Sequence, residues 1–168
     1  RRANVTMRKQ ITGYGRRDAR SGEVLGERAL DLPETTLETT ALYYVLPSDL
    51  TASLQQQGDF LGGIHAAEHA MISMFPFSFL CDRRDVGGLS TPVHPHTDRS
   101  TIFIYDGYPG GVGLARSGYA DFDELARTTH DMVTACDCAE GCPACVQSPH
   151  CGNGNDPLDK AVAAELLA

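Results

Sequence analysis

The first third of the chain alternates polar residues with β-branched and aromatic ones. Three segments have the Val, Thr and Tyr content of strands: residues 4–14 (NVTMRKQITGY), 24–32 (VLGERALDL) and 35–46 (TTLETTALYYVL). Ser21-Gly22 offers a turn between the first two segments, and Pro33 separates the second from the third. The pattern predicts an antiparallel β meander over residues 1–47.

The middle of the chain contains one long segment that is apolar almost all round. Residues 60–80 (FLGGIHAAEHAMISMFPFSFL) are too many for an ordinary strand, so they predict a buried central helix that Pro76 should kink or end. The turn-rich residues 81–100 are expected to form loops. Residues 101–105 (TIFIY) predict a short central strand. Further helices are expected over about 49–56 with Ser48 as N-cap, over about 111–135, and from Pro157 to Ala168 with Asp156 as N-cap.

These elements predict an α+β fold with an N-terminal antiparallel β meander, a buried central helix, a short central strand, and helices flanking a cysteine-rich loop. The length of 168 residues fits one domain. We divide it into the meander (1–47), a helical and αβ core (48–135), and the cysteine loop with a terminal helix (136–168). The chain begins without Met and in the middle of a strand pattern, so we expect a piece of a larger protein. The chain has no run of 18 apolar residues, so no membrane span is expected.

Charge is distributed unevenly along the chain. The net charge of −8 disfavours nonspecific binding to nucleic acid. Residues 1–20, however, hold seven basic side chains against the single acid Asp18, a balance of +6 that leaves −14 for the rest. A basic N-terminal segment of this kind either contacts phosphates or is an edge strand protected by charge.

Five of the six cysteines fall within sixteen residues, in the stretch CDCAEGCPACVQSPHC. The spacing C-x-C-x3-C-x2-C places four soft ligands on two short loops, as a tetrahedral zinc site requires. A disulfide knot and an iron–sulfur cluster are the alternatives. Spacing alone does not decide whether Cys151 or His150 replaces one of the first four. Those four are Cys136, Cys138, Cys142 and Cys145.

His65, Glu68 and His69 match the H-x-x-E-H pattern of inverted zinc peptidases, in which both histidines bind zinc and the glutamate is the base. A third ligand would be needed, for which Asp82, Asp106 or Glu124 are the acidic candidates. The alternative is a polar cluster on a buried helix, satisfied by the loops packed on it. In a variant of that alternative, a network of Glu68, His69, Asp82 and Asp106 fixes the following glycine loop.

The glycine loop, residues 107–113 (GYPGGVG), follows the predicted central strand. Glycines between a strand and a helix can cradle a phosphate on backbone N–H groups. The chain has neither G-x-x-x-x-G-K-[ST] nor G-x-G-x-x-G, so a tight strand-to-helix connection is the favoured interpretation.

Several blocks together resemble the C-terminal region of MrfA-type superfamily 2 DEAD/DEAH-box helicases, which are linked to DNA repair and have RecQ-like relatives in fungi. These blocks are HAAEHAMISMFP, CDRRDVGGLSTPVHP, TIFIYDGYPGGVGLA and CDCAEGCPACVQSPHCGNGNDPLDKA. The resemblance covers roughly the whole chain and is strongest from His65 onward. It implies that this is the family's zinc-binding MZB domain, with Cys136, Cys138, Cys142 and Cys145 as structural zinc ligands and Cys151 as a neighbour.

The resemblance also implies a role. The fragment would be an accessory domain, not catalytic alone, that assists DNA strand handling beside a 3′-to-5′ helicase motor in the same polypeptide. ATP and Mg²⁺ would bind only in that motor, and the protein would act in the cytoplasm at the bacterial nucleoid. The alternative is a metal-dependent hydrolase or nuclease-like domain using His65, Glu68 and His69, and a plain protein-interaction domain is a third possibility.

Overall fold

A computed structural model describes all residues, 1–168, and its centre is a four-stranded sheet in the order β1-β4-β6-β5. Every neighbouring pair is antiparallel. The strands are β1 (Arg2–Lys9), β4 (Thr35–Val45), β5 (Val86–His94) and β6 (Arg99–Asp106). The predicted strand at 101–105 is thus the inner strand β6. Strand β5 was predicted as loop, and that prediction was wrong.

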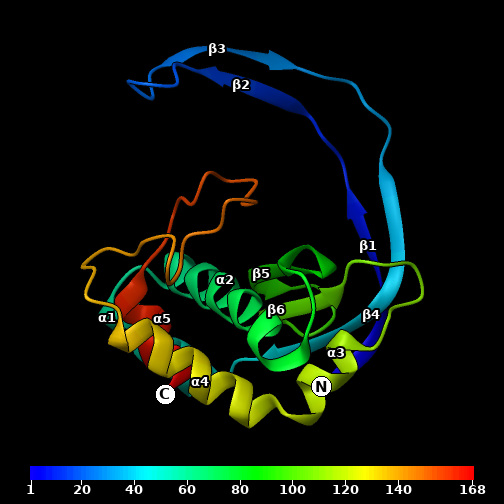
Figure 1. The fold of residues 1–168 in the computed structure, drawn as a ribbon, viewed down its shortest axis with the longest axis vertical. Helices are drawn as coiled ribbons and strands as arrows, with labels where there is room; N and C mark the ends of the chain where they lie inside the picture. Colours follow the sequence, from blue (N-terminus) through cyan, green and yellow to red (C-terminus); the bar gives the residue numbers. More distant parts are fainter.

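An arm formed by β2 (Gly13–Arg17), β3 (Val24–Ala29) and their turn continues outward from β1 and β4. Figure 1 shows this two-stranded ribbon standing away from the body and arching over it. Every residue of β2 and β3 is exposed, so the ribbon has no core of its own. The predicted meander is therefore one long hairpin whose tip, the arm, leaves the sheet.

The predicted central helix is α2 (Phe60–Phe79), which packs over the sheet and contacts α5 (Lys160–Leu167). The Asp59 side chain caps its first turn by accepting a hydrogen bond from the Gly62 N–H at 3.1 Å. Gly63 lets the two helices approach closely, because a Cβ at this position would lie 2.1 Å from Val162 Cγ1. Pro76 lies inside the last turns of the helix, which ends three residues later.

The remaining helices differ from their predicted bounds. The helix α1 (Ser48–Gln57) begins after Pro47, and no side chain caps it. The helix expected over about 111–135 is two helices, α3 (Leu114–Ala120) and α4 (Phe122–Ala135), with Asp121 between them. The N-cap of α5 is Asp159 and not Asp156, because Asp159 accepts the Val162 N–H at 2.9 Å. A short 3-10 turn, η1 (Arg83–Asp85), precedes β5.

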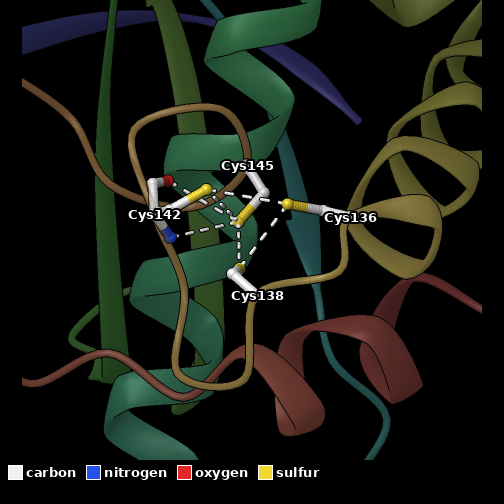
Figure 2. Close-up of side chains that lie close together, drawn as sticks. All are labelled: Cys136, Cys138, Cys142 and Cys145. Atoms are coloured by element: carbon white, nitrogen blue, oxygen red, sulfur yellow. Dashed lines mark hydrogen bonds between the residues drawn. The ribbon is translucent and has the colours of Figure 1, made fainter.

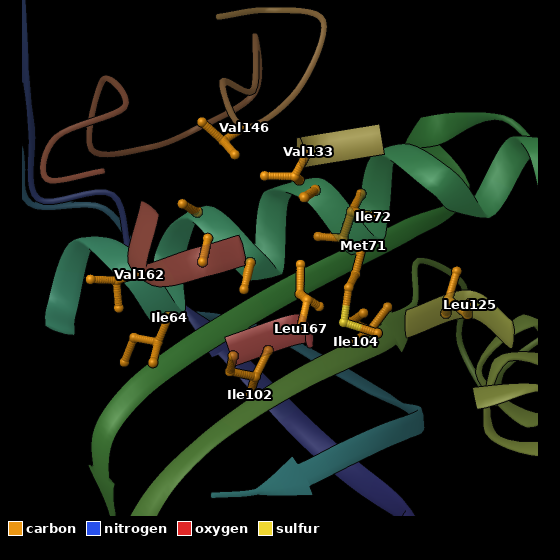
Figure 3. Close-up of a cluster of buried hydrophobic side chains, with 14 of the residues drawn as sticks. Ile64, Met71, Ile72, Ile102, Ile104, Leu125, Val133, Val146, Val162 and Leu167 are labelled. Carbon is orange, nitrogen blue, oxygen red and sulfur yellow. The ribbon is translucent and has the colours of Figure 1, made fainter. Parts of the chain in front are cut away.

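The buried hydrophobic side chains form one cluster between α2, the sheet and the C-terminal helices (Figure 3). Met71 and Phe75 of α2 and Ile102 and Ile104 of β6 are at most 1% exposed. The cluster also includes Cys145 and Val146, which follow α4. The cysteine-rich segment is therefore anchored in the core at its far end. No helix has both the length and the apolar character needed to cross a membrane.

Candidate metal centres and a basic cavity

The four sulfurs of Cys136, Cys138, Cys142 and Cys145 converge in the loop that follows α4 (Figure 2). Four of the sulfur–sulfur distances are 3.5 Å (136–138), 3.6 Å (136–142), 3.4 Å (138–145) and 3.8 Å (142–145). A tetrahedral Zn²⁺ with Zn–S bonds of about 2.3 Å holds its sulfurs ~3.8 Å apart. The four sulfurs therefore already lie at separations close to those around a zinc ion.

A tight turn presents the second pair of cysteines. The N–H groups of Cys145 and Gln147 both bond to the Cys142 carbonyl, at 3.0 and 3.1 Å, and the Cys142 N–H points at the Cys145 sulfur at 3.3 Å. Gly141 precedes the turn with φ +102° and lies against Val146, where a side chain would be both strained and crowded. The local sequence thus fixes two of the four sulfurs in place.

Burial and hydrogen bonding act in opposite directions on the thiols of this group. Burial raises the pKa of the Cys145 thiol to about 12. For Cys138, burial is outweighed by sulfhydryl hydrogen bonds from Cys145, Cys136 and Cys142, and its pKa falls to about 7. The Lys160 ammonium donates to the carbonyls of Cys136 and Cys138 at 2.5 and 2.6 Å. Four thiolates around Zn²⁺ would carry a net charge of −2, and the positive charge of Lys160 lies beside them.

Cys151 is not part of the four-sulfur group, and neither is the exposed His150. The Cys151 sulfur instead lies 3.4 Å from His65 Nε2, and it forms a second convergent group with His65 and His69. Sequence spacing missed this group because Cys151 and His65 are 86 positions apart.

Glu68 takes no part in the second group, although it lies between the two histidines in sequence. Its carboxylate faces the sheet, since a Cβ added to Gly88 of β5 would lie 2.6 Å from Glu68 Oε1. Burial raises its pKa. The imidazole of His69 is also buried, and this lowers its pKa to about 4. The H-x-x-E-H arrangement of a zinc peptidase therefore does not form around these residues.

The acidic residues proposed as a third ligand lie elsewhere. Asp82 caps η1, and Glu124 pairs with Arg127 on the surface of α4. The fully buried Asp106 accepts N–H groups from Val112, Gly113 and Ala115 at 2.6–2.7 Å. The alternative of a four-residue network does not form, because Asp106 fixes the glycine loop without Glu68, His69 or Asp82.

The same bonds decide between the two interpretations of the glycine loop. The N–H groups that a phosphate would need at Val112 and Gly113 are taken by the Asp106 carboxylate. Gly110, Gly111 and Gly113 have positive φ, so the loop needs glycine for its backbone path. The loop is a strand-to-helix connection.

A cavity of about 830 Å³ lies between the end of β1, α2, β5 and the segment around Cys151. Its lining holds the cationic side chains of Arg8, Lys9, Arg83 and Arg84, and the buried Glu68 is its one acidic residue. The Arg83 Nη2 atom is buried and has no hydrogen-bond partner. This N–H group is therefore an unsatisfied donor, and a charged acceptor would form the strongest hydrogen bond with it. The net negative charge of the whole chain gives no indication of this local basic site.

A family model described as the MrfA Zn-binding domain matches residues 67–146, which include all four converging cysteines. An uncharacterized protein of Methanocaldococcus jannaschii is 38% identical over 107 residues, which are 62% of this chain and 96% of that protein. The ATP-dependent helicase YprA of Bacillus subtilis is 31% identical over 146 residues, which are 85% of this chain and 19% of the helicase.

The fold has a solved counterpart. The crystal structure of DUF1998 helicase MrfA bound to DNA matches with a TM-score of 0.66 and 26% identity, over 99% of this chain and 21% of that one. The chain thus spans about a fifth of the length of these helicases. With its four-cysteine cluster, its sheet and its central helix, the chain belongs to the family of MrfA Zn-binding domains.

Proposed function

We propose that this chain is the zinc-stabilised accessory domain of an ATP-dependent DNA helicase. Zinc is held by Cys136, Cys138, Cys142 and Cys145, whose sulfur separations support this ligand set. Four thiolates complete the tetrahedron and leave no position for a reacting water, so the metal is structural. Zinc binding on the order of 10 kcal/mol orders a loop that has little apolar content of its own.

The domain contacts DNA through the basic cavity. The observation that carries this proposal is the cationic lining of the cavity, in which Arg83 has a guanidinium nitrogen without a hydrogen-bond partner. Arg84 is exposed beside it, and Arg8 and Lys9 line the opposite side on β1. A single strand passing between the arm and α2 would place its phosphates against this lining. MrfA, which shares the fold, has been solved with DNA.

The motor lies elsewhere in the same polypeptide, as the fivefold greater length of the helicase relatives suggests. ATP and Mg²⁺ bind there, and this domain is not catalytic alone. By resemblance to its family, the whole protein translocates 3′ to 5′ in DNA repair, at the nucleoid in the cytoplasm. The accessory domain guides one strand as the motor advances.

Arg83→Gln and Arg84→Gln, made in the helicase that contains this domain, test the DNA contact. Single-stranded DNA affinity is measured as a function of salt. Each lost phosphate contact should reduce the slope of log K against log salt by about 0.7 and weaken binding several-fold at low salt. Arg127→Gln is the matched control, since Arg127 pairs with Glu124 on an exposed helix face.

An unchanged slope in Arg83→Gln would refute the cavity as the DNA path. Zinc content of the same preparations separates that outcome from a failure of the metal assignment. A protein-interaction domain would leave the slope unchanged in all three variants.

A further inference from the structure

Three potential metal ligands converge outside the four-cysteine cluster. His65 and His69 stand one turn apart on α2, and Cys151 comes from the loop that follows the four cysteines. Their ligand atoms all lie within 4.8 Å of one another. Two of the three residues, His65 and Cys151, also lie outside the stretch 67–146 that matches the zinc-binding family model.

Backbone carbonyls orient both imidazole rings. His65 Nδ1 lies 2.8 Å from the Pro157 carbonyl oxygen, and His69 Nδ1 lies 2.9 Å from the Val146 carbonyl oxygen. A carbonyl only accepts, so each Nδ1 carries the proton and each neutral ring keeps its lone pair on Nε2. Histidines that bind metals usually donate their other N–H to a carbonyl or carboxylate in this way.

The sulfur of Cys151 is also prepared for a ligand's role. The backbone N–H groups of Asn153 and Asn155 both point at it, at 3.4 Å. Cysteine binds metals as an anion, and these two dipoles direct their positive ends at that atom. No other cysteine is grouped with it, because the remaining four of the cluster form their own group.

We propose that His65, His69 and Cys151 form a second metal site, selective for a borderline-soft divalent cation such as Zn²⁺ or Co²⁺. Two imidazoles and one thiolate are the donor set that such ions prefer. All three residues line the cavity, so the fourth ligand of a tetrahedral ion is a water or another small donor from it. The ion fastens the segment from Ser148 to Pro157 onto α2, across 86 positions of sequence.

This site shares no residue with the four-cysteine cluster and does not require Glu68, which faces the sheet. With three protein ligands in place of four, it should release its ion before the cysteine cluster does. A chelator titration is therefore expected to show two separate steps.

The test is a Co²⁺ titration of the metal-free, reduced chain, with bound metal measured by elemental analysis after gel filtration. Sulfur-to-cobalt charge-transfer absorption reports thiolate ligation. The wild-type chain should bind about two Co²⁺, one at each group of ligands. Cys151→Ser and His65→Gln should each bind about one, because each variant removes one ligand of the second group. Cys81→Ser is the matched control because Cys81 belongs to neither group, and it should bind as many as the wild type.

A wild-type chain that binds only one Co²⁺ would overturn the second site, and so would Cys151→Ser that retains two. If Cys151→Ser does not fold, His65→Gln and the wild-type stoichiometry still decide. The result is independent of DNA binding, since the four-cysteine cluster accounts for the first equivalent in every variant.

Discussion

The cysteine loop (residues 136–145) and the arm (residues 13–29) both leave the helix–sheet body, but different forces hold them. The cysteine loop ends in the core, where Cys145 and Val146 are at most 1% exposed, and four sulfurs gather within it. The arm has no buried residue in either strand and rests on the hydrogen bonds of one two-stranded ribbon. Two-stranded ribbons are at best marginally stable by themselves.

The comparison shows two ways in which a small domain extends a surface beyond its core. On the proposed ligand set, metal ligation takes the place of apolar burial in the cysteine loop, so the structure of this loop would depend on an ion. The arm depends instead on its continuity with β1 and β4, which pair from Arg2–Leu42 to Lys9–Thr35. Loss of the ion and loss of the arm should therefore affect stability very differently.

Removing one zinc ligand should have the largest effect. Cys142→Ser is expected to lower zinc content and to reduce the unfolding free energy by about 3–5 kcal/mol, because zinc binding is coupled to folding of the loop. The melting temperature should fall by roughly 10 °C, as read by circular dichroism. Cys81→Ser, outside both metal groups, is the control. Full zinc with an unchanged melting curve would show that the ligand set is misassigned.

The expected effect on stability is intermediate for the glycine loop, which is held by a buried carboxylate. It lies between the effects expected for the cysteine loop and for the arm. Asp106→Ala leaves three N–H groups of the loop without their buried acceptor, which should cost about 3 kcal/mol by denaturant unfolding. Asp31→Asn, at an exposed position, should change stability by less than about 0.5 kcal/mol. Equal effects at the two positions would contradict the role given to Asp106.

Charge compensation beside the cysteine loop should have a smaller effect. Lys160→Met removes the ammonium that binds the Cys136 and Cys138 carbonyls, and zinc affinity should fall about tenfold, as for other groups that support metal ligands. Competition with a chromogenic chelator measures this. The chain's one other lysine, Lys9, gives the matched variant Lys9→Met, which should keep wild-type affinity. Equal affinity in both variants would mean that Lys160 only caps carbonyls.

Replacing the arm by a short turn should have the smallest effect on stability, below about 0.5 kcal/mol, because no core residue is lost. Hydrogen exchange should show fast exchange along β2 and β3 in the intact chain, with or without zinc. Amides of residues 142–147 should be protected only when zinc is bound. Slow exchange in the arm would contradict the view that the arm is held only by its own strand pairing, and it would indicate contacts with the body.

Sequence reasoning succeeded where the signal was local. The long apolar run of α2 and the β-branched run of β6 each carry their own pattern, and the α+β class followed from them. The convergence of the four sulfurs also follows from short spacing, while their assignment as ligands stays a prediction.

Strand β5 was missed because Gly87, Gly88 and Pro92 lower its apparent strand propensity. The structure needs those glycines: a Cβ at Gly87 would lie 2.5 Å from the Tyr105 ring, and one at Gly88 would meet Glu68. Close packing against neighbouring side chains requires glycine at these two positions, so the low strand propensity of this segment was misleading.

The convergence of His65, His69 and Cys151 could not be predicted from the sequence, for a related reason. His65 and Cys151 meet only after α2 and the C-terminal segment have packed together. The H-x-x-E-H spacing identified the correct helix face for the two histidines, but it suggested an acidic partner where the fold supplies a thiol. Contacts between distant segments carry no periodic signal.

The continuity of the arm with β4 has a mechanical consequence. A force that draws the arm away from the body runs along β4, which is paired to β6 from Ala41–Tyr105 to Val45–Thr101. Ladder hydrogen bonds lie perpendicular to their strands, so this force shears them all at once instead of opening them one by one. The weakly held arm is thereby joined to the sheet along the direction in which the β4–β6 pairing best resists force. Tension on the arm should be transmitted into the core before β4 slips.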